Sequence, residues 1–290
     1  MKFKNHKIIL GTVQFGLNYG INNQRGQPDA DRVSGILDYA FAQGIRTLDS
    51  ADAYGNAPEI IGRYHASRSE QFEIITKFKA GRDFVAEAWL NQQLEKFAVQ
   101  SLYACLFHDF QDYQANRRVI SEFDGLVGKG LVKKVGVSVY TNQQFLEAIQ
   151  DERISLIQLP YNLLDNDFQR GALLARAKSG GKETHVRSVF LQGLFFMDLG
   201  KIPKKLASFE PELEELHQLS SQFNIPLESL ALNYAMANEN IDRVLIGVDS
   251  RKQLETNLSA LHQTLPPEMV ATVNRIKVKE VDLLNPTNWK

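Results

Sequence analysis

The chain has 290 residues, of which 43% are hydrophobic and 23% charged, and its formal net charge is -1. This near-neutral charge excludes the electrostatic footprint of a protein that binds nucleic acid or an anionic membrane. Apolar runs such as residues 242–248 are too short to cross a bilayer, and residues 1–11 lack the apolar core of a signal peptide. The single cysteine, Cys105, excludes an internal disulfide and is typical of a reducing compartment. We therefore expect a soluble cytoplasmic protein.

Eight short apolar segments have the composition of buried β-strands. They are continuously apolar rather than alternating, which predicts that both faces of the sheet are covered. Glycine, aspartate and serine gather after them, as expected where a strand stops. The segments are residues 7–12, 45–50, 72–77, 102–108, 132–138, 154–160, 184–190 and 242–248.

Segments with helical apolar spacing lie between these strands. In residues 29–44, Val33, Ile36 and Leu37 fall on one helical face, and Gly44 suits a helix C-cap. The same pattern recurs at residues 84–99, 119–130, 142–151 and 168–180. A strand and a helix repeated eight times predict an α/β fold, a (β/α)8 TIM barrel with a closed parallel sheet.

The connection after the seventh predicted strand is the longest one. It runs from about residue 191 to 241 and contains extra helices at residues 211–223 and 226–238. The residues after 262 predict one further helix and a tail. Because no change of composition marks a linker, we expect residues 1–290 to form a single domain.

Polar side chains stand at the ends of three predicted strands. Asp49 lies at the end of the second strand, Lys77 ends the third and His108 ends the fourth. Tyr54 lies in the loop directly after Asp49. Because the active sites of such barrels form at the carboxyl ends of the strands, we expect these four side chains to converge on one mouth.

This combination suits the reduction of a carbonyl group. A tyrosine hydroxyl, with a reference pKa of about 10, is a proton donor at neutral pH, and a nearby ammonium lowers that pKa. Asp49 can keep Lys77 charged in a semi-buried site, and His108 can orient a carbonyl oxygen by a hydrogen bond. The favoured chemistry is therefore protonation of an oxyanion that forms as a cofactor supplies hydride.

Each of these residues also fits a purely structural role. Asp49 has the position of a turn or helix cap, and Tyr54 that of an amphipathic surface residue. His108 fits a satisfied core histidine, and Lys77 a long side chain at the edge of the core. Cys105 has apolar neighbours, which favours a core residue over a thiol nucleophile. The four polar residues argue for catalysis only as a set.

Seven segments together resemble the aldo-keto reductase family over almost the whole chain. The first, LDSADAYGNAPEIIG (48–62), resembles the Asp, Tyr-Gly and Glu signature of that family. The others are ITKF (75–78), LFHD (106–109), GVSVY (136–140), QLPYN (158–162), RSVFLQGL (187–194) and LIGVDSRKQLETNL (245–258). Their order along the chain makes the resemblance specific.

The resemblance implies a role for each residue of the set. Tyr54 would be the general acid, Lys77 would lower its pKa, Asp49 would pair with Lys77, and His108 would orient the substrate carbonyl. The residues implied to contact the nicotinamide cofactor are Gly11, Thr12, Asp49, Ser138, Gln158, Arg187, Ser188, Gln192, Gly193, Gly247, Ser250, Arg251, Gln253 and Asn257. No Gly-x-Gly-x-x-Gly motif follows the first strand, as expected for a nucleotide site that is not a Rossmann one.

Two positions depart from the family pattern near the nicotinamide. Val139 follows Ser138 where the family has asparagine, so one hydrogen bond to the carboxamide is replaced or lost. Arg187 stands where the family stacks an aromatic ring. Its planar guanidinium can stack, disfavour the oxidised positive ring, bind an anionic substrate group, or pair with a neighbouring acid.

The adenosine end of the cofactor leaves its identity open. Asp249 stands where small or basic residues of the family face a 2′-phosphate, and its carboxylate would repel that group. Arg251, two residues further on, could compensate. We expect NADPH on the strength of the resemblance, and NADH is not excluded.

The substrate is expected to be a small carbonyl compound, either a sugar-like or polyol carbonyl or an aromatic aldehyde. Its contacts are assigned to Phe15, Tyr54, His108 and Arg187. No metal site is expected, because six histidines with Asp49 and His108 make a thin ligand set for a barrel hydrolase. We expect a monomer or a weak homo-oligomer.

Two other functions compete with the reductase. One is a Schiff-base lyase or aldolase that uses Lys77 as nucleophile, although an adjacent Asp49 would keep the amine charged. The other is a nucleotide-binding regulatory subunit that keeps the fold without turnover. Cofactor binding separates the first from the reductase, and turnover separates the second.

Overall fold

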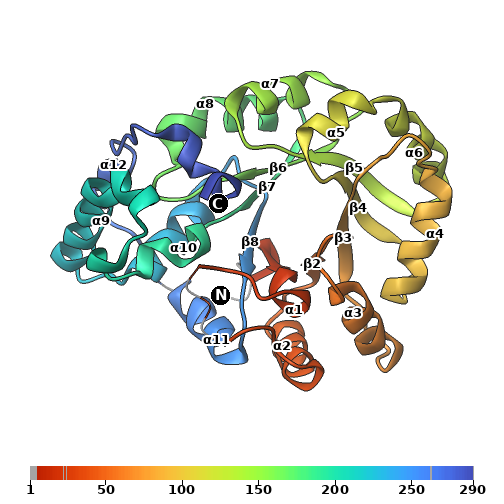
Figure 1. Ribbon diagram of the computed structural model, residues 1–290, viewed down its shortest axis with the longest axis horizontal. Coiled ribbons are helices and arrows are strands. Elements are labelled where there is room, and N and C mark those ends of the chain that lie inside the picture. Colours follow the sequence, from red (N-terminus) through yellow and green to blue (C-terminus); the bar gives the residue numbers. More distant parts are fainter. Residues whose placement is uncertain (1–4, 22, 24, 262, 290) are drawn as a thin grey trace.

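The computed structural model describes residues 5–21, 23, 25–261 and 263–289. Eight parallel strands close into a barrel in which each strand pairs with the next and β8 pairs with β1. The strands are β1 (Ile8–Gly11), β2 (Thr47–Asp49), β3 (Glu73–Phe78), β4 (Leu102–Phe107), β5 (Val132–Ser138), β6 (Leu156–Pro160), β7 (Glu183–Arg187) and β8 (Arg243–Gly247). Figure 1 shows them in the middle of the molecule. The predicted (β/α)8 barrel is confirmed.

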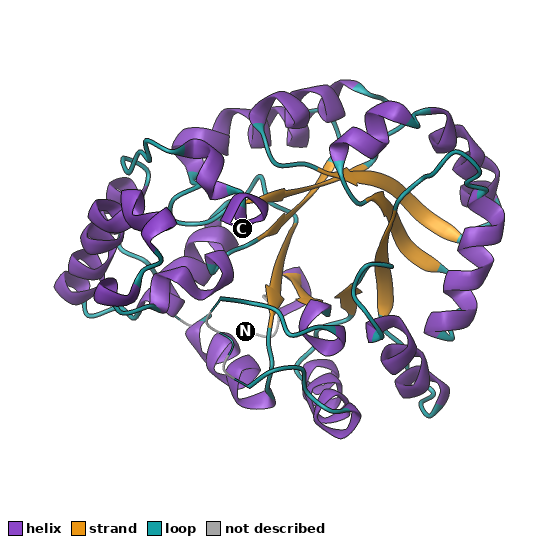
Figure 2. Cartoon of the chain, in the orientation of Figure 1, coloured by secondary structure: helices purple, strands orange, loops and turns teal. Residues whose placement is uncertain are grey.

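The strands are buried on both faces, as their continuous apolar sequences predict. The interior of the barrel is filled by a cluster of Ile9, Ile75, Ala104, Leu106 and Leu156, none of which is exposed. A much larger apolar cluster fills the space between the strands and the surrounding helices. Figure 2 shows the helices as an outer layer around the strands. The two clusters together hold the strand ends in a fixed arrangement.

Local signals in the sequence set several helix boundaries. The Asp29 side chain accepts a hydrogen bond from the Arg32 backbone N–H at the start of α2. Gly44 follows that helix with a φ of 87°, the left-handed conformation that glycine adopts at low cost. At the start of α7, Thr141 and Gln144 form a reciprocal capping box.

Most predicted helices are present, with ends that differ by one or two residues. The predicted ones are α2 (Ala30–Ala42), α4 (Ala86–Phe97), α6 (Arg118–Gly128), α7 (Asn142–Gln150), α8 (Asp167–Ser179), α9 (Glu210–Phe223), α10 (Leu227–Ala237) and α12 (Pro267–Val273). Helices α9 and α10 belong to the β7–β8 connection, and with α12 they lie on one side of the barrel (Figure 1).

Four further helices went unpredicted. They are α1 (Val13–Gly16), α3 (Ala57–Ala66), α5 (Phe110–Ala115) and α11 (Arg251–Ala260). The seventh strand also ends earlier than expected, at Arg187, because residues 188–193 turn out of the strand with several positive φ angles. Throughout the described ranges, no helix has the length and apolar character needed to cross a membrane.

Candidate active site

A cavity of about 670 Å³ lies at the carboxyl ends of the strands. The four predicted catalytic residues line it, namely Asp49 on β2, Tyr54 in the loop that follows, Lys77 on β3, and His108 directly after β4. The loops after β1, β7 and β8 supply much of the remaining wall. A cavity of this size is in the range used for cofactors and small substrates.

A buried ion pair lies at the bottom of this cavity. The Lys77 ammonium pairs with Asp49 and donates a second hydrogen bond to the Ser50 carbonyl at 3.1 Å. The other carboxylate oxygen of Asp49 accepts a hydrogen bond of 2.8 Å from the Gln158 amide. Burial lowers the pKa of Lys77, and the charge of Asp49 opposes that change. The pair is therefore held by several bonds rather than by charge alone.

Tyr54 is placed by close backbone contact between α1 and the loop after β2. A Cβ atom on Gly16 would lie 1.8 Å from the Tyr54 carbonyl oxygen, so only glycine fits there. The Tyr54 ring meets the His108 ring edge to face, with centroids 6.0 Å apart, and the Lys77 ammonium lies 5.2 Å from its centroid. The phenol therefore lies beside both the cation and the imidazole.

The Tyr54 hydroxyl stays protonated at neutral pH. Burial raises its pKa above the ordinary value of 10, the charge of Asp49 raises it further, and the charge of Arg187 acts to lower it. The sequence predicted that Lys77 would lower this pKa, but burial and the negative charge of Asp49 act in the opposite direction and the pKa rises. A protonated phenol is the form that can give a proton to an oxyanion.

His108 is a neutral imidazole at the same pH. Burial lowers its pKa to about 4, and the charge of Lys77 contributes to the decrease while that of Asp49 opposes it. A neutral ring has one N–H donor, which suits a hydrogen bond to a carbonyl oxygen.

Gln158, in the middle of β6, lies beside the ion pair, and Ser138, the last residue of β5, is its neighbour in register. The Gln158 Nε2 atom is used by Asp49, but its Oε1 atom is buried and accepts no hydrogen bond from the described residues. A buried acceptor without a donor is costly, and the amide N–H of a nicotinamide carboxamide would satisfy it. The residues present therefore fit a nicotinamide group at this place.

The Arg187 guanidinium lies on the other side of Ser138. It stacks on the Tyr140 ring, 4.2 Å from the centroid, and donates long hydrogen bonds to Ser138 Oγ at 3.4 Å and to the Val139 carbonyl at 3.3 Å. Within the described ranges it forms no ion pair, so the predicted alternative of an acid partner is not seen. Arg187 lines the cavity, and no carboxylate of the described residues lies within ion-pair distance of its guanidinium.

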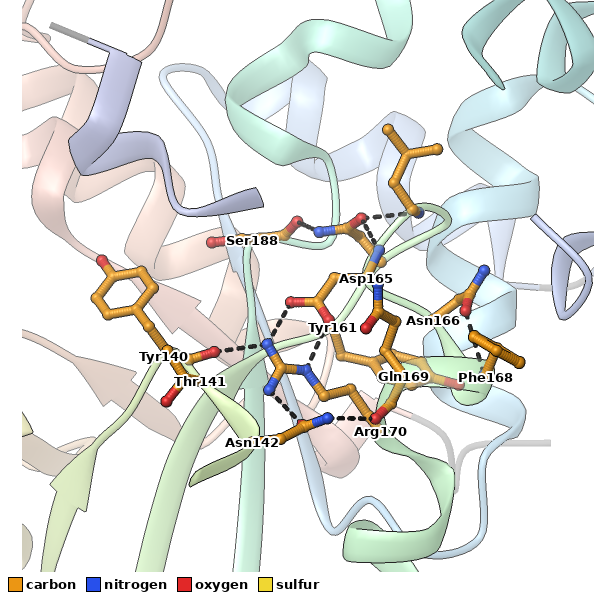
Figure 3. A network of polar contacts seen from close by, with 12 residues as sticks. Tyr140, Thr141, Asn142, Tyr161, Asp165, Asn166, Phe168, Gln169, Arg170 and Ser188 are labelled. Carbon is orange, nitrogen blue, oxygen red and sulfur yellow. Dashed lines mark hydrogen bonds and ion pairs between the residues drawn. The ribbon is translucent and has the colours of Figure 1, made fainter. Parts of the chain in front are cut away.

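A second buried ion pair ties together the loops around this wall (Figure 3). The Arg170 guanidinium binds both carboxylate oxygens of Asp165, at 2.6 and 2.7 Å, and donates to the Asn142 side chain and to the Tyr140 carbonyl. The loops after β5 and β6 are thereby joined. This network went unpredicted, because nothing in the spacing of Asp165 and Arg170 marks them as partners.

The loop after β7 has an unusual backbone. Ser188, Leu191 and Gln192 adopt positive φ angles of 59°, 44° and 56°, and Gly193 follows at 90°. Left-handed conformations of residues other than glycine cost energy and persist only where the surrounding structure holds them. They cluster at functional sites. The Gln192 amide also donates to the Tyr19 hydroxyl at 3.2 Å, which joins this loop to the loop after β1 across the cavity.

The loop after β8 and the first turns of α11 line the outer part of the cavity. Gly247, Ser250, Gln253 and Asn257 are in its wall, as predicted, and Ser250 caps α11 by accepting from the Gln253 N–H. Asp249 is there too. A Cβ atom at 247 would lie 2.5 Å from the end of the Gln14 side chain, which would have to move aside.

Two predicted site residues do not face the cavity. Phe15 was expected to contact substrate, but it is fully buried in the apolar core, because the single turn of α1 directs it away from the mouth. Arg251 was expected near the adenosine. It instead pairs with Glu255 at 2.8 Å and lies over the Tyr39 ring at 4.8 Å, outside the cavity lining.

The other predicted residues are brought together at one cavity. The lining includes Gly11, Thr12, Asp49, Tyr54, Lys77, His108, Ser138, Gln158, Arg187, Ser188, Gln192, Gly193, Gly247, Ser250, Gln253 and Asn257. It also includes Gln14, Tyr140, Glu228 and Lys252, which the sequence analysis did not single out. In the part of the chain that the structure describes, no group of three or more His, Cys, Asp or Glu side chains is placed to hold a metal ion.

Similar proteins share this architecture. Among solved structures, an aldo-keto reductase of Bacillus halodurans in its holo form superposes with a TM-score of 0.75 at 19% identity, covering 94% of each chain. The glycerol dehydrogenase of Gluconobacter oxydans superposes with a TM-score of 0.73 at 19% identity, over 93% of this chain and 90% of the other. At this identity the likeness concerns the fold.

The sequence comparisons concern the family. An L-glyceraldehyde 3-phosphate reductase of Escherichia coli O157:H7 is 25% identical over 83% of this chain and 82% of its own. The pyridoxal 4-dehydrogenase of Microbacterium luteolum is 23% identical over 91% of this chain and 92% of its own. The model of the Aldo/keto reductase family matches residues 7–278. The chain therefore belongs to the aldo/keto reductase family and is a nicotinamide-dependent oxidoreductase.

Proposed function

We propose that residues 1–290 act as one domain that reduces an aldehyde or ketone to an alcohol, with Tyr54 as the proton donor. The observation that carries this proposal is the position of the Tyr54 phenol. It is protonated, lies beside His108 and Lys77, and lines a cavity whose wall offers a free amide acceptor on Gln158. When bound, a reduced nicotinamide supplies the hydride. NADPH is the form expected from the resemblance, with NADH left open.

The residues of the chain divide the remaining work. Gln158 and Ser138 would hold the carboxamide, and the Gln158 amide links that contact to Asp49. His108 donates an N–H to the carbonyl oxygen and orients it. As charge develops on that oxygen, Tyr54 gives it a proton, and the Lys77 ammonium stabilises the phenolate left behind.

The buried ion pair argues against the Schiff-base alternative. A nucleophilic lysine must be neutral and reach the substrate. The Lys77 ammonium instead donates to Asp49 and to the Ser50 carbonyl, and the residue is only 2% exposed. The reductase mechanism needs Lys77 charged and paired with Asp49, which is the state that the structure has.

A sugar-like carbonyl is the substrate class that the site favours. The cavity lining includes the Tyr19 hydroxyl and the Arg25 guanidinium, which can contact hydroxyl groups of a substrate. Two relatives are named for reactions of L-glyceraldehyde 3-phosphate and D-arabinose, which are compounds of this class. Arg187 adds a cation near the reacting groups that could contact substrate.

Replacement of Tyr54 by phenylalanine tests the proposal. We expect the Tyr54→Phe variant to lose at least about a hundredfold in kcat for aldehyde reduction, because proton donation is removed. The dissociation constant of the reduced cofactor should change less than about threefold, since the phenol does not hold it. Aldehyde-dependent oxidation of the cofactor at 340 nm measures the first, and nicotinamide fluorescence measures the second.

The matched control is Tyr19→Phe, which removes a second phenol from the same cavity, one whose hydroxyl accepts from the Gln192 amide. It should keep turnover within about tenfold, because no proton transfer is assigned to it. Near-normal turnover in Tyr54→Phe would refute the assignment of the donor. Wild-type protein that binds a reduced nicotinamide but turns over no aldehyde would support the regulatory subunit instead.

A further inference from the structure

An uncompensated carboxylate stands in the outer wall of the cavity. Asp249 lines the cavity, and its Oδ1 atom is covered from solvent yet accepts no hydrogen bond from the described residues. A charged carboxylate that loses water without gaining a donor is destabilised. A ligand that brings hydroxyl donors to this wall is therefore favoured, and one that brings a second anion is disfavoured.

The position of Asp249 relates it to the far end of a bound dinucleotide. The reacting groups lie at the strand ends, whereas Asp249 lies two residues beyond Gly247, in the loop between β8 and α11. The cavity is continuous between these places. A nicotinamide held at Gln158 therefore leaves the rest of the dinucleotide to extend outward along the loops after β7 and β8.

The cation expected to offset this carboxylate is directed elsewhere. Arg251 donates to Glu255 and covers the Tyr39 ring, so its charge is already paired. Lys252 is the other basic residue of that turn, and it lines the cavity as an exposed side chain. Glu228, on α10, adds a second negative charge to the lining of the cavity. Among the described residues, Asp249 forms no ion pair with either basic residue of this turn.

The start of α11 would otherwise attract an anion. The amino end of a helix carries a partial positive charge and free N–H groups. Here the Ser250 side chain already accepts from the Gln253 N–H, and the Gln253 side chain accepts from the Asp249 N–H. The charge of Asp249 also offsets the helix dipole, which leaves little attraction for a phosphate.

Resting on the proposed function, we propose that Asp249 makes this enzyme selective for NADH over NADPH. Its carboxylate accepts hydrogen bonds from the ribose hydroxyls of the adenosine and repels a 2′-phosphate. This replaces the expectation of NADPH, which depended on the resemblance alone.

Fluorescence titration of the purified protein with NADH and with NADPH measures the two dissociation constants directly. We expect NADH to bind at least about tenfold more tightly than NADPH. In the Asp249→Asn variant, which keeps the shape and removes the charge, the ratio should fall about tenfold, mainly because NADPH binds more tightly. Both dissociation constants are measured on the same sample, so a fraction of unfolded variant affects both alike and leaves their ratio unchanged.

The Arg251→Gln variant separates the two residues. We expect it to leave both dissociation constants within about twofold, because its side chain lies outside the cavity. A large loss of NADPH affinity in that variant would show that Arg251 turns inward to bind a phosphate, and the proposal would be wrong. The same conclusion follows if wild type prefers NADPH, or if Asp249→Asn leaves the ratio unchanged.

Failure of the proposed function has a different result. If neither NADH nor NADPH binds to wild type, the nicotinamide reductase itself is refuted, and the selectivity proposal falls with it. Competition with AMP and with 2′,5′-ADP adds a readout of the adenosine end alone. AMP should displace NADH at lower concentration than 2′,5′-ADP in wild type, and the order should weaken in Asp249→Asn.

Discussion

His108 stays neutral mainly because it is buried, and positive charges nearby add to the effect. After burial, Lys77, Lys79 and Arg187 lower its pKa, and Asp49 alone raises it. A neutral ring can orient a carbonyl oxygen without competing to protonate it. The proton transfer is thereby left to Tyr54, whose phenol burial keeps protonated. Burial shifts the two pKa values in opposite directions, because it disfavours the charged form, which is the deprotonated tyrosine and the protonated histidine.

This neutrality has a measurable effect on stability. The folded pKa of His108 is about 4 and that of an unfolded histidine about 6.5, so acid protonates the unfolded chain first. The stabilising contribution is therefore present above pH 6.5 and is lost as the pH falls toward 4. We expect the free energy of unfolding of wild type, relative to His108→Gln, to decrease by about 1–2 kcal/mol from pH 7 to pH 4.5.

Urea denaturation of both proteins at the two pH values measures this difference. The comparison with the variant removes the contribution of carboxylates, which titrate alike in both proteins. A difference that does not change with pH would mean that His108 is solvated enough to keep its ordinary pKa.

Contacts between elements set the position of the proton donor. The short helix α1 meets the loop after β2 through backbone atoms, and Gly16 is the residue at the contact. A few atoms there decide where the Tyr54 phenol lies relative to His108. Backbone contact is stiffer than side-chain contact, because no rotamer can move aside.

Addition of one methyl group at Gly16 should displace the donor. In Gly16→Ala, the new Cβ would lie 1.8 Å from the Tyr54 carbonyl oxygen, so the loop must shift. We expect a loss of about 1–3 kcal/mol in the free energy of unfolding and at least about a hundredfold in kcat. The control is Gly35→Ala, where a Cβ meets nothing within 4 Å and helix α2 should gain up to about 1 kcal/mol. Unchanged turnover in Gly16→Ala would show that the loop is free to move.

The pair of Arg170 and Asp165 connects three elements in another way. It joins the loops after β5 and β6 to α8. It also binds the carbonyl of Tyr140, the residue whose ring stacks against Arg187. Figure 3 shows the guanidinium at the centre of these contacts. The stacked Tyr140 and Arg187 therefore depend on a pair that does not itself touch the cavity.

Removal of one partner should cost more than removal of both. Arg170→Met leaves the Asp165 carboxylate buried alone, and we expect a loss of about 3–5 kcal/mol in the free energy of unfolding. Arg170→Met with Asp165→Leu should lose less than the sum of the two single variants. Denaturant unfolding of the four proteins gives the coupling. Additive losses would show that the two groups act independently.

The arrangement of the whole barrel followed from the sequence, because continuous apolar strands and amphipathic helices allow few alternatives. The strand at 132–138 was predicted to the residue. Helices α3 and α11 were missed because their residues were interpreted only as family motifs, and their helical apolar spacing was not considered. The end of β7 was placed too late, because positive φ angles at Ser188 and Gln192 leave no mark in the residue types.

The site was predictable as far as the strand ends determine it. Asp49, Lys77 and His108 lie where the register of a parallel barrel places them. Side-chain direction beyond the strands was not predictable: Phe15 turns into the core and Arg251 onto Tyr39. The direction of the pKa shift at Tyr54 was not predictable either, because it depends on how deeply the phenol is buried and on the charge of Asp49.

Closure of the barrel joins the two ends of the chain. Strand β1 pairs with β2 and with β8, so the backbone of Ile8–Gly11 receives its second partner only from residues 243–247. During synthesis, the first strand must therefore wait with one edge exposed until almost the whole chain has left the ribosome. An unpaired apolar edge of this kind is a site for aggregation, and pairing over such a distance is slow. The catalytic mouth can be assembled only when the last strand arrives.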